Sequence, residues 1–324
     1  MRGHSLGGPV GVGGVDRVLV IVPPAGHAAF PFRGGTLHGP VVSRGLPGPG
    51  FEWRHRVCRL AHTLLDPAVR RATAAALGQA ANPGWTVAFQ GDAILATGGG
   101  GATGLRLWDL SDPRRARPIG AIKENMGVLN AAFGPRGALL AVVQDRDVHL
   151  WRVADPRHPV RLAGFTAHPY SVRKVVFSRN GRTLATAGLD GTARLWDVST
   201  PERPRPLAVM SGHVGGVQSV AISPDGRALA TAGMDGTVRL WDVSAMARPV
   251  LRAVLSGHGD RVHAVTFGPG GRVLLTSGED RTARLWITDP ERVAAQVCAL
   301  AHPRVTEREW ARYFPGLEYR PPCR

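Results

Sequence analysis

The chain has 324 residues, of which 44% are hydrophobic, and a formal net charge of +16 at pH 7. Its length allows a large buried core, and its three cysteines are too few, and odd in number, for a disulfide-stapled secreted fold. The apolar run over residues 18–22 ends at two prolines, so it predicts neither a membrane span nor a well-formed signal peptide. We therefore expect a cytoplasmic protein with no membrane partner.

The basic excess has two interpretations. All but two of the 40 basic residues are arginine, the exceptions being Lys123 and Lys174. Arginine together with abundant glycine, alanine and proline is what a GC-rich genome encodes by mutational pressure. The alternative is a selected basic surface for an acidic partner, such as nucleic acid.

Two segments precede the regular part of the chain. Residues 1–53 are dense in glycine and proline, so we expect them to be mostly disordered, or an artefact of a misplaced start codon. Residues 54–84 have apolar side chains at helical spacing beside a basic side, which predicts a helical segment packed on a neighbour. A membrane or nucleic-acid helix is the alternative. The apolar positions are Val57, Leu60, Ala61, Leu64, Leu65, Val69, Ala72, Ala76 and Leu77.

Residues 85–287 repeat one unit five times. The last three copies end in LDGTARLWD, MDGTVRLWD and EDRTARLWI, and their tryptophans are 45 residues apart. Two earlier tryptophans continue the series at steps of 45 and 43 residues. The five are Trp108, Trp151, Trp196, Trp241 and Trp286. A repeat of this length predicts a solenoid or a propeller.

The fourth unit shows what each copy builds. Residues 217–222 and 228–233 have strand character and flank an Asp-Gly turn; residues 237–243 and 250–256 predict two further strands. Four short strands in meander order are typical of a propeller blade. The predicted fold class is therefore an all-β propeller of five four-stranded blades, with short helices after it.

Counting back from the last three tryptophans gives aspartate at six residues, threonine at ten and histidine at 28. A single such set would suggest a hydroxyl nucleophile with its base and orienting acid. Three identical sets instead indicate a structural hydrogen-bond network, because an active site is normally built once. The network residues are His168, Thr186, Asp190, Trp196, His213, Thr231, Asp235, Trp241, His258, Thr276, Asp280 and Trp286.

The Gly-His pairs at 212–213 and 257–258, the Trp-Asp pairs at 196–197 and 241–242, and the spacing between them resemble WD-repeat β-propellers. That resemblance implies a hydrogen-bond chain inside each blade, from the tryptophan through the hydroxyl and the histidine to the aspartate. It also implies a docking scaffold for proteins rather than an enzyme. Because each member of such a chain is buried, each needs its partner.

The first two units depart from this pattern, and we expect softer blades there. Counting back from Trp151 gives Asp145, but Lys123 stands in place of histidine and Ala141 in place of threonine. Before Trp108, a run of four glycines lengthens the turn by one residue, which leaves Thr97 at the hydroxyl position. Ala102 and Ala80 then replace the aspartate and the histidine. The glycine run is no phosphate loop, since no Lys-Ser/Thr follows it.

Five blades leave the closure of the ring open. Propellers of the family usually close with seven blades, so the chain predicts an open fan, a tight five-bladed ring, or the end of a longer ancestral array. An open fan exposes strand edges. We favour the ancestral history, with an open or loosely closed array now.

Residues 288–324 form a predicted helical tail. Asp289 and Pro290 are typical of a helix start, for a helix to about Leu300, and Thr306 with Glu309 predicts a second helix to about Phe314. The proline-rich connectors and this ending resemble the C-terminal propellers of large actinobacterial regulators. The chain has no Walker motif and no kinase loop, so no such activity is carried over. Cys298 and Cys323 flank the tail helices and could pair.

The blade geometry implied by the resemblance predicts two faces. One collects the first-to-second-strand turns and the third-to-fourth-strand connectors, and we name it the Arg face. Its arginines are Arg114, Arg115, Arg117, Arg157, Arg161, Arg182, Arg203, Arg205, Arg227 and Arg272. The opposite, His–Asp face carries the loops between blades and the aspartate turns. Its predicted partner-binding residues are Tyr170, Arg173, Leu189, Gln218, Met234, Asp260, His263 and Glu279.

These features favour a non-catalytic scaffold that binds a protein or peptide on the His–Asp face, in bacterial regulation or signalling. They predict no cofactor and no metal. One alternative is binding of nucleic acid or another polyanion on the Arg face; another is a truncated remnant of a larger multidomain regulator. The oligomeric state and the partner's identity do not follow from the residues.

Overall fold

The computed structural model describes residues 84–91, 93–99, 104–112, 116–123, 126–289 and Arg308. Their strands form five antiparallel sheets, in each of which every strand pairs with the next along the chain. Blades 1 to 5 are these sheets in chain order. The strands are β1 (Gly84–Gln90), β2 (Ile94–Gly99), β3 (Leu105–Asp109), β4 (Arg117–Ile122); β5 (Asn130–Phe133), β6 (Leu139–Gln144), β7 (Asp147–Arg152), β8 (Val160–Thr166); β9 (Val172–Phe177), β10 (Thr183–Gly188), β11 (Ala193–Asp197), β12 (Arg205–Met210); β13 (Val217–Ile222), β14 (Ala228–Gly233), β15 (Val238–Asp242), β16 (Val250–Leu255); β17 (Val262–Phe267), β18 (Val273–Gly278) and β19 (Ala283–Ile287).

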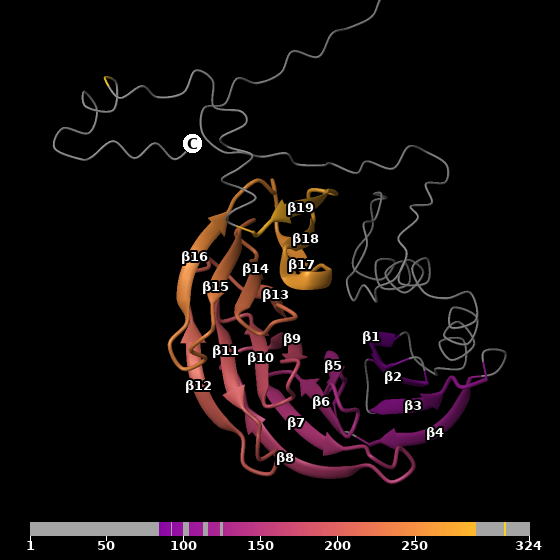
Figure 1. The fold of residues 1–324 in the computed structure, drawn as a ribbon. Coiled ribbons are helices and arrows are strands. Elements are labelled where there is room, and N and C mark those ends of the chain that lie inside the picture. The colour runs from indigo at the N-terminus through magenta and orange to yellow at the C-terminus, as the bar shows by residue number, and fades with distance from the viewer. Residues whose placement is uncertain are drawn as a thin grey trace, which may run out of the picture.

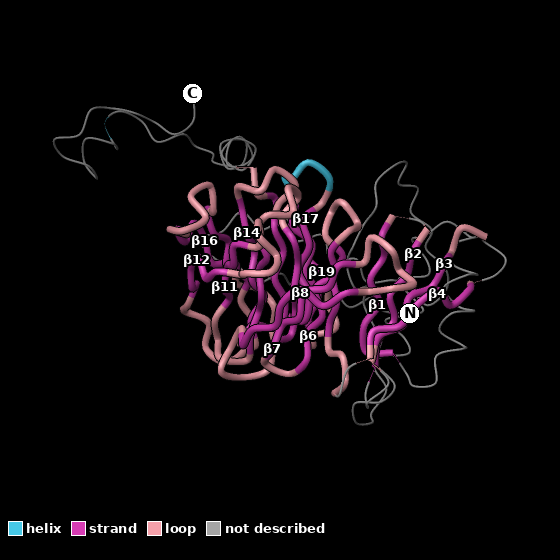
Figure 2. The backbone as a smooth tube through the Cα atoms, turned by 90° about the horizontal axis from the view of Figure 1, so that it is seen from below, coloured by secondary structure: helices cyan, strands magenta, loops and turns pink. Residues whose placement is uncertain are grey.

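The sheets stand side by side around an arc (Figure 1), so the predicted all-β propeller architecture is confirmed. The first strands of neighbouring blades, β1, β5, β9, β13 and β17, contact one another in series at the inside of the arc. Among the described residues the arc is open, because no strand fills the space between blade 5 and blade 1 (Figure 1). Loops project from two opposite faces when the arc is seen edge-on (Figure 2).

The Leu-Trp pair of each third strand explains how the blades stack. Successive side chains of a strand point to opposite sides of the sheet. Leu150 therefore packs with Val172 and Leu184 of the following blade, whereas Trp196 packs back on that same interface from blade 3. We name the two sides of each blade the Leu side and the Trp side.

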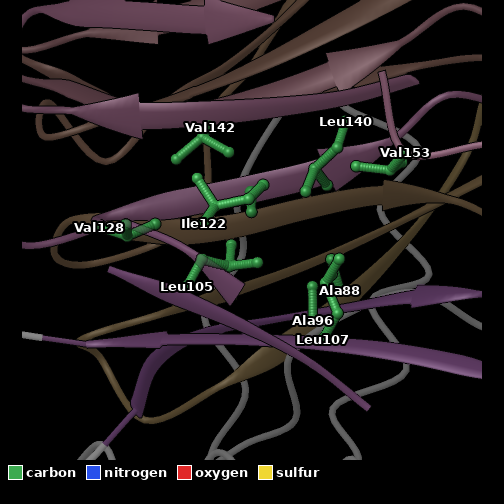
Figure 3. Close-up of a cluster of buried hydrophobic side chains, with 10 residues drawn as sticks. Ala88, Ala96, Leu105, Leu107, Ile122, Val128, Leu140, Val142 and Val153 are labelled. Atoms are coloured by element: carbon green, nitrogen blue, oxygen red, sulfur yellow. The ribbon is translucent and has the colours of Figure 1, made fainter. Parts of the chain in front are cut away.

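Every neighbouring pair of blades encloses one apolar layer between a Leu side and a Trp side. Figure 3 shows the layer between blades 1 and 2, where Leu105 and Leu107 face Leu140 and Val142. Equivalent layers join blades 2 and 3, blades 3 and 4, and blades 4 and 5. Because both sides of an inner blade are covered, nearly every residue of its second strand is buried.

The turns between first and second strands need glycine. Gly181 and Gly226 have φ values of 71° and 74°, a left-handed conformation that glycine adopts without strain. In blade 4, Asp225 accepts hydrogen bonds from the Ser223 hydroxyl at 2.5 Å and from the Arg227 N–H at 3.0 Å. The Asp-Gly pair thus holds both sides of a tight turn on the Arg face.

The segments expected on either side of the blades fall outside this description. Residues 1–53 are not described, and of the predicted helical segment 54–84 only Gly84 is, as the first residue of β1. Of the predicted tail, Thr288 and Asp289 are described as loop and Arg308 as helical. The described residues contain no helix long and apolar enough to cross a membrane.

Candidate functional site

Each of blades 3, 4 and 5 contains one hydrogen-bond chain that runs from its core to the His–Asp face. In blade 3 the Trp196 Nε1 lies 3.1 Å from the Thr186 hydroxyl, which lies 2.8 Å from His168 Nε2. The His168 Nδ1 lies 3.0 Å from an Asp190 carboxylate oxygen. Blades 4 and 5 repeat the arrangement through Trp241, Thr231, His213 and Asp235, and through Trp286, Thr276, His258 and Asp280.

The two ends of each chain set the direction of every proton in it. An indole N–H only donates and an ionised carboxylate only accepts. The Thr186 oxygen therefore accepts from Trp196, its hydroxyl donates to His168 Nε2, and the Nδ1–H of His168 donates to Asp190. This order requires a neutral histidine, because a second ring proton at Nε2 would compete with the threonine hydroxyl proton.

The electrostatics of the chain agree with a neutral ring. Burial is the main cause that lowers the pKa of His168, His213 and His258, and it outweighs the opposing attraction of the aspartates. Burial by itself raises the pKa of Asp190, but hydrogen bonds from Thr192 and the neighbouring His168 bring it below the usual value. The carboxylates are therefore ionised and the imidazoles uncharged at neutral pH.

A second threonine in each blade, which the spacing argument missed, holds the aspartate. Thr192 donates its N–H and its hydroxyl to Asp190 at 3.0 and 2.8 Å. Thr237 and Thr282 do the same for Asp235 and Asp280. The repeated Asp-x-Thr sequence in the turn carried this signal, since a threonine two residues after an aspartate is placed to close such a turn.

The glycine before each aspartate turn makes room for the histidine ring. A Cβ at Gly188 would come within 2.2 Å of His168 Nδ1, and one at Gly233 within 2.2 Å of His213 Nδ1. At Gly278 it would come within 3.0 Å of the His258 ring. Ring and turn backbone therefore touch directly, and the loop between blades is tied to the turn that follows it.

Blade 2 replaces this tie with a different one. Its Gln144, which is buried, donates from Nε2 to the Met126 carbonyl at 2.9 Å and so links turn to loop with an amide. Asp145 instead accepts from the Ser171 hydroxyl of the next blade. Lys123, at the position counted for histidine, is exposed.

The structure also corrects the residue counted as the hydroxyl position of blade 2. Leu140 pairs with Trp151 as Leu184 pairs with Trp196, but the intervening turn is one residue shorter. The position equivalent to Thr186 is therefore Val142 and not Ala141. Because valine offers no acceptor, the buried Trp151 Nε1 has no hydrogen-bond partner in the described part of the chain.

Blade 1 keeps half of the chain. The Trp108 Nε1 donates to the Thr97 hydroxyl at 2.8 Å, so the extra residue counted in the glycine run is present in the register as well. Ala80 and Ala102, the residues expected in place of histidine and aspartate, lie outside the described residues. In the first two blades, the tryptophan N–H is thus hydrogen-bonded only where the second strand supplies a hydroxyl.

The eight predicted partner-binding residues separate into two groups on the His–Asp face. Leu189 from blade 3 and Met234 from blade 4 form an apolar pair, and Tyr170, 65% exposed, precedes Ser171, whose carbonyl accepts the Leu189 N–H at 2.9 Å. Leu189 and Met234 close over Gly216, where a Cβ would lie 2.7 Å from one and 3.0 Å from the other. Val214, which the sequence argument missed, is 79% exposed in the same loop. Tyr170, Leu189, Val214 and Met234 are named the apolar patch.

The other members of the set are polar. Arg173 donates to Gln218 across blades 3 and 4 at 3.2 Å, beside the apolar patch. In blade 5, Glu279 is paired with His263 at 3.0 Å and lies 3.8 Å from Arg261, and Asp260 is exposed. The His–Asp face is thus apolar over blades 3 and 4 and charged over blade 5.

The Arg face is mixed in charge rather than uniformly basic. Its described arginines are exposed, while Arg114 and Arg115 lie outside the described residues. Hydrogen bonds from Ser111, together with the charges of Arg117 and Arg157, lower the pKa of Asp109. Ser199 and two further arginines act in the same way on Asp197. Each of these aspartates lies near two arginines of the Arg face, whose charges it partly offsets.

No cluster of histidine, cysteine, aspartate or glutamate among the described residues has the geometry to hold a metal ion. In His168, His213 and His258 both ring nitrogens are hydrogen-bonded to threonine and aspartate, which leaves neither nitrogen for a ligand. What this face offers is a surface with apolar and charged contacts on a rigid scaffold.

Four sheets have the predicted four strands, but blade 5 has only β17, β18 and β19 among the described residues. Stacked blades of this kind, three of them with the same internal hydrogen-bond chain, define a propeller-type repeat protein. Residues 159–197, 204–242 and 249–286 each match the family model described as "WD domain, G-beta repeat". These three stretches are accordingly WD repeats. Comparison with curated protein sequences finds no match.

The matched stretches also show how the blades are coupled. Residues 204–242 contain β12 to β15, so each sequence repeat starts with the last strand of one blade and ends with the third strand of the next. Each matched repeat therefore joins two neighbouring blades through the polypeptide chain. Blade 1 and the first three strands of blade 2, which lack the full hydrogen-bond chain, are not among the matched residues.

Proposed function

We propose that this chain is a non-catalytic docking scaffold that binds a protein or peptide through the apolar patch on its His–Asp face. WD-repeat domains in general bind protein partners, and the apolar patch is the observation that supports this site. Large apolar side chains exposed together are uncommon on a surface without a partner, whereas aromatic, methionine and arginine residues are typical anchors of interfaces.

Rigidity supports the same proposal. Leu189 and Met234 each stand next to an aspartate whose carboxylate is held by a histidine and a threonine. A partner that binds there meets side chains on turns that are already ordered, so little conformational entropy is lost at the interface. The hydrogen-bond chains thus serve docking without contacting the partner.

The setting of this scaffold is part of the proposal. We place it in the bacterial cytoplasm, in regulation or signalling, because the connectors and the tail resemble those of actinobacterial regulators. A role without chemistry follows from the threefold repetition of the only Ser/Thr–His–Asp constellation in the described residues. The same resemblance leaves open descent from a larger multidomain regulator.

The experiment is selection of peptides from a random display library against the full chain. Peptides that bind the patch should lose at least tenfold in affinity for Met234→Asp and for Tyr170→Ala, as expected for interface anchors. The matched control is Arg227→Ala, an exposed change on the Arg face, which should leave affinity unchanged. Peptides that bind Met234→Asp as tightly as the unaltered chain would place docking elsewhere.

A polyanion on the Arg face is the second candidate, favoured by the exposed arginines of that face. Its affinity for a labelled DNA duplex should fall steeply between about 50 and 200 mM salt, because phosphate contacts release counterions. Arg182→Glu should weaken it further. The aspartates between the arginines argue for a weak interaction, and salt-independent or absent binding removes this candidate.

A further inference from the structure

The Leu sides of the five blades are not equally covered. The first residue of strand three on this side, Leu105, Val148, Ala193 and Val238, is fully buried in blades 1 to 4. Its counterpart in blade 5, Ala283, is partly exposed, and the next on that side, Leu285, is 40% exposed. Leu275 of β18 is also partly exposed. The Leu side is thus covered by the next blade in blades 1 to 4, whereas in blade 5 it is partly exposed.

A second copy of the chain is a poor occupant for this surface. To continue the array head to tail, it would have to present the Trp side of its own blade 1. That side holds Leu95 and Trp108, which are fully buried, together with Leu110 and Ala116. Because these large side chains are already buried, this end of the array offers a neighbour little apolar surface beyond the partly buried Val87 and Phe89.

The chain itself leaves blade 5 at the edge of the uncovered side. The Thr288 N–H donates to the Arg272 carbonyl at 3.0 Å, and its hydroxyl donates to the Gly271 carbonyl at 2.8 Å. Asp289 lies 3.8 Å from the Arg272 guanidinium. These contacts fix the start of residues 290–324 to blade 5, so that this segment is present there at a high effective concentration.

The composition of this segment matches a sheet side of that size. The helix expected over residues 289–300 places Val293, Val297 and Leu300 on one face, and the second expected helix places Trp310 and Phe314 on one face. Arg308, within the second helix, is helical. A helix of about 11 residues is roughly 16 Å long, and a six-residue strand spans roughly 20 Å, so one such helix covers a strand pair.

We propose that residues 290–324 pack their apolar faces on the Leu side of blade 5, against Leu275, Ala283 and Leu285, and so form the cap of that end of the array. The uncovered side is then an internal interface of the full chain. Repeat arrays need such caps, because a terminal repeat otherwise leaves its stacking surface in water.

Hydrogen–deuterium exchange on the full chain tests the cap. Residues 273–287 should exchange slowly in the unaltered protein, and Val297→Asp, in the tail, should speed their exchange at least tenfold. Leu285→Arg, on the blade, should do the same. In both variants, the exchange of residues 183–197 in blade 3 should be unaffected. The control Val214→Asp, which places a charge in the exposed loop between blades 3 and 4, should leave the exchange of all segments unchanged.

Three outcomes would overturn the cap. Val297→Asp could leave residues 273–287 unchanged, which would mean that the tail does not cover them; this variant does not alter a blade, so it decides the matter even if Leu285→Arg unfolds blade 5. Those residues could exchange rapidly in the unaltered protein. Their protection could also rise with protein concentration, which would make a second copy the occupant.

Discussion

Blades 3 to 5 and blades 1 and 2 have the same strand order and the same apolar layers, but they satisfy their buried polar groups differently. Blade 4 connects tryptophan, threonine, histidine and aspartate in one chain. Blade 2 has valine where the threonine would be and ties its loop with Gln144 alone. The apolar layers thus suffice to build a blade, whereas the polar chain determines how firmly its loop and turn are held.

The two weaker blades also differ from each other, since blade 1 keeps the Trp108–Thr97 hydrogen bond and blade 2 keeps none of the chain. Removing one member leaves the next without its partner in a low-dielectric interior, which costs more than removing them all. In blade 2 the threonine and the histidine are both replaced and the counted aspartate contacts another blade. The four predictions below probe this contrast, in order of decreasing effect.

The largest effect is expected from breaking one complete chain. His213→Ala leaves the Asp235 carboxylate, only 12% exposed, with Thr237 as its one remaining side-chain partner among those of the intact chain, and leaves the Thr231 hydroxyl without an acceptor. The free energy of unfolding should fall by about 3 kcal/mol, measured by urea denaturation. Lys123→Ala, at the position counted for histidine in blade 2, is the matched control and should change it by less than about 0.5 kcal/mol. Equal losses at both positions would contradict the contrast between the blades.

Acidification should soften blades 3 to 5 before blades 1 and 2. Each network histidine has a lower pKa in the folded chain than the ordinary 6.5, so below that pH the unfolded state binds more protons than the folded state. Stability is therefore present above pH 6.5 and is lost as pH falls toward the folded-state pKa. The slope is up to about 1.4 kcal/mol per pH unit for each histidine. Hydrogen exchange at pH 7 and pH 5.5, corrected for intrinsic rates, should show this in blades 3 to 5 alone.

Restoring a hydroxyl should strengthen blade 2. Val142 occupies the strand position at which Thr186 accepts from Trp196 in blade 3. Val142→Thr therefore places an acceptor close to the Trp151 Nε1, which has no hydrogen-bond partner in the described residues. The free energy of unfolding should rise by about 1 kcal/mol, the net value of one hydrogen bond. Val142→Ala, which removes buried methyl groups and adds no acceptor, should lower it. A decrease with threonine as well would show that the indole is satisfied in another way.

The smallest effect is expected at an exposed ion pair. Arg152 and Glu202 are 3.2 Å apart with side chains 54% and 49% exposed. Glu202→Gln should change the free energy of unfolding by less than about 0.5 kcal/mol, because solvent screens such pairs. A loss comparable to that of His213→Ala would mean that charge pairs on the rim matter as much as buried chains, contrary to the comparison above.

Much of this organisation was predictable because it repeats. The 45-residue step of the tryptophans predicts the blades, and the strands of unit four lie within a residue of their predicted ends. The predicted resemblance to WD repeats is confirmed for the three matching stretches. Periodicity carries this information because each copy solves the same burial problem.

What did not repeat was harder to predict. Counting residues from Trp151 chose Ala141, since only the strand register reveals that the turn of blade 2 is one residue shorter. The hydrogen bond from Gln144 to the Met126 carbonyl has no counterpart in another blade, so the repeat spacing could not predict it. Val214 lies in a loop whose exposure depends on how two blades meet. The open arc, by contrast, agrees with the open or loosely closed array that the count of five blades favoured.

The open arc has a consequence for how the protein is made. Each described blade contacts only its neighbours along the chain, so every layer of the core forms between segments close in sequence. Contacts of low sequence separation form quickly, and domains built from them can fold while the ribosome is still extending the chain. In a closed ring, the outer side of the first blade would stay uncovered until the last blade had been synthesised. Here assembly can proceed blade by blade, in the order of synthesis.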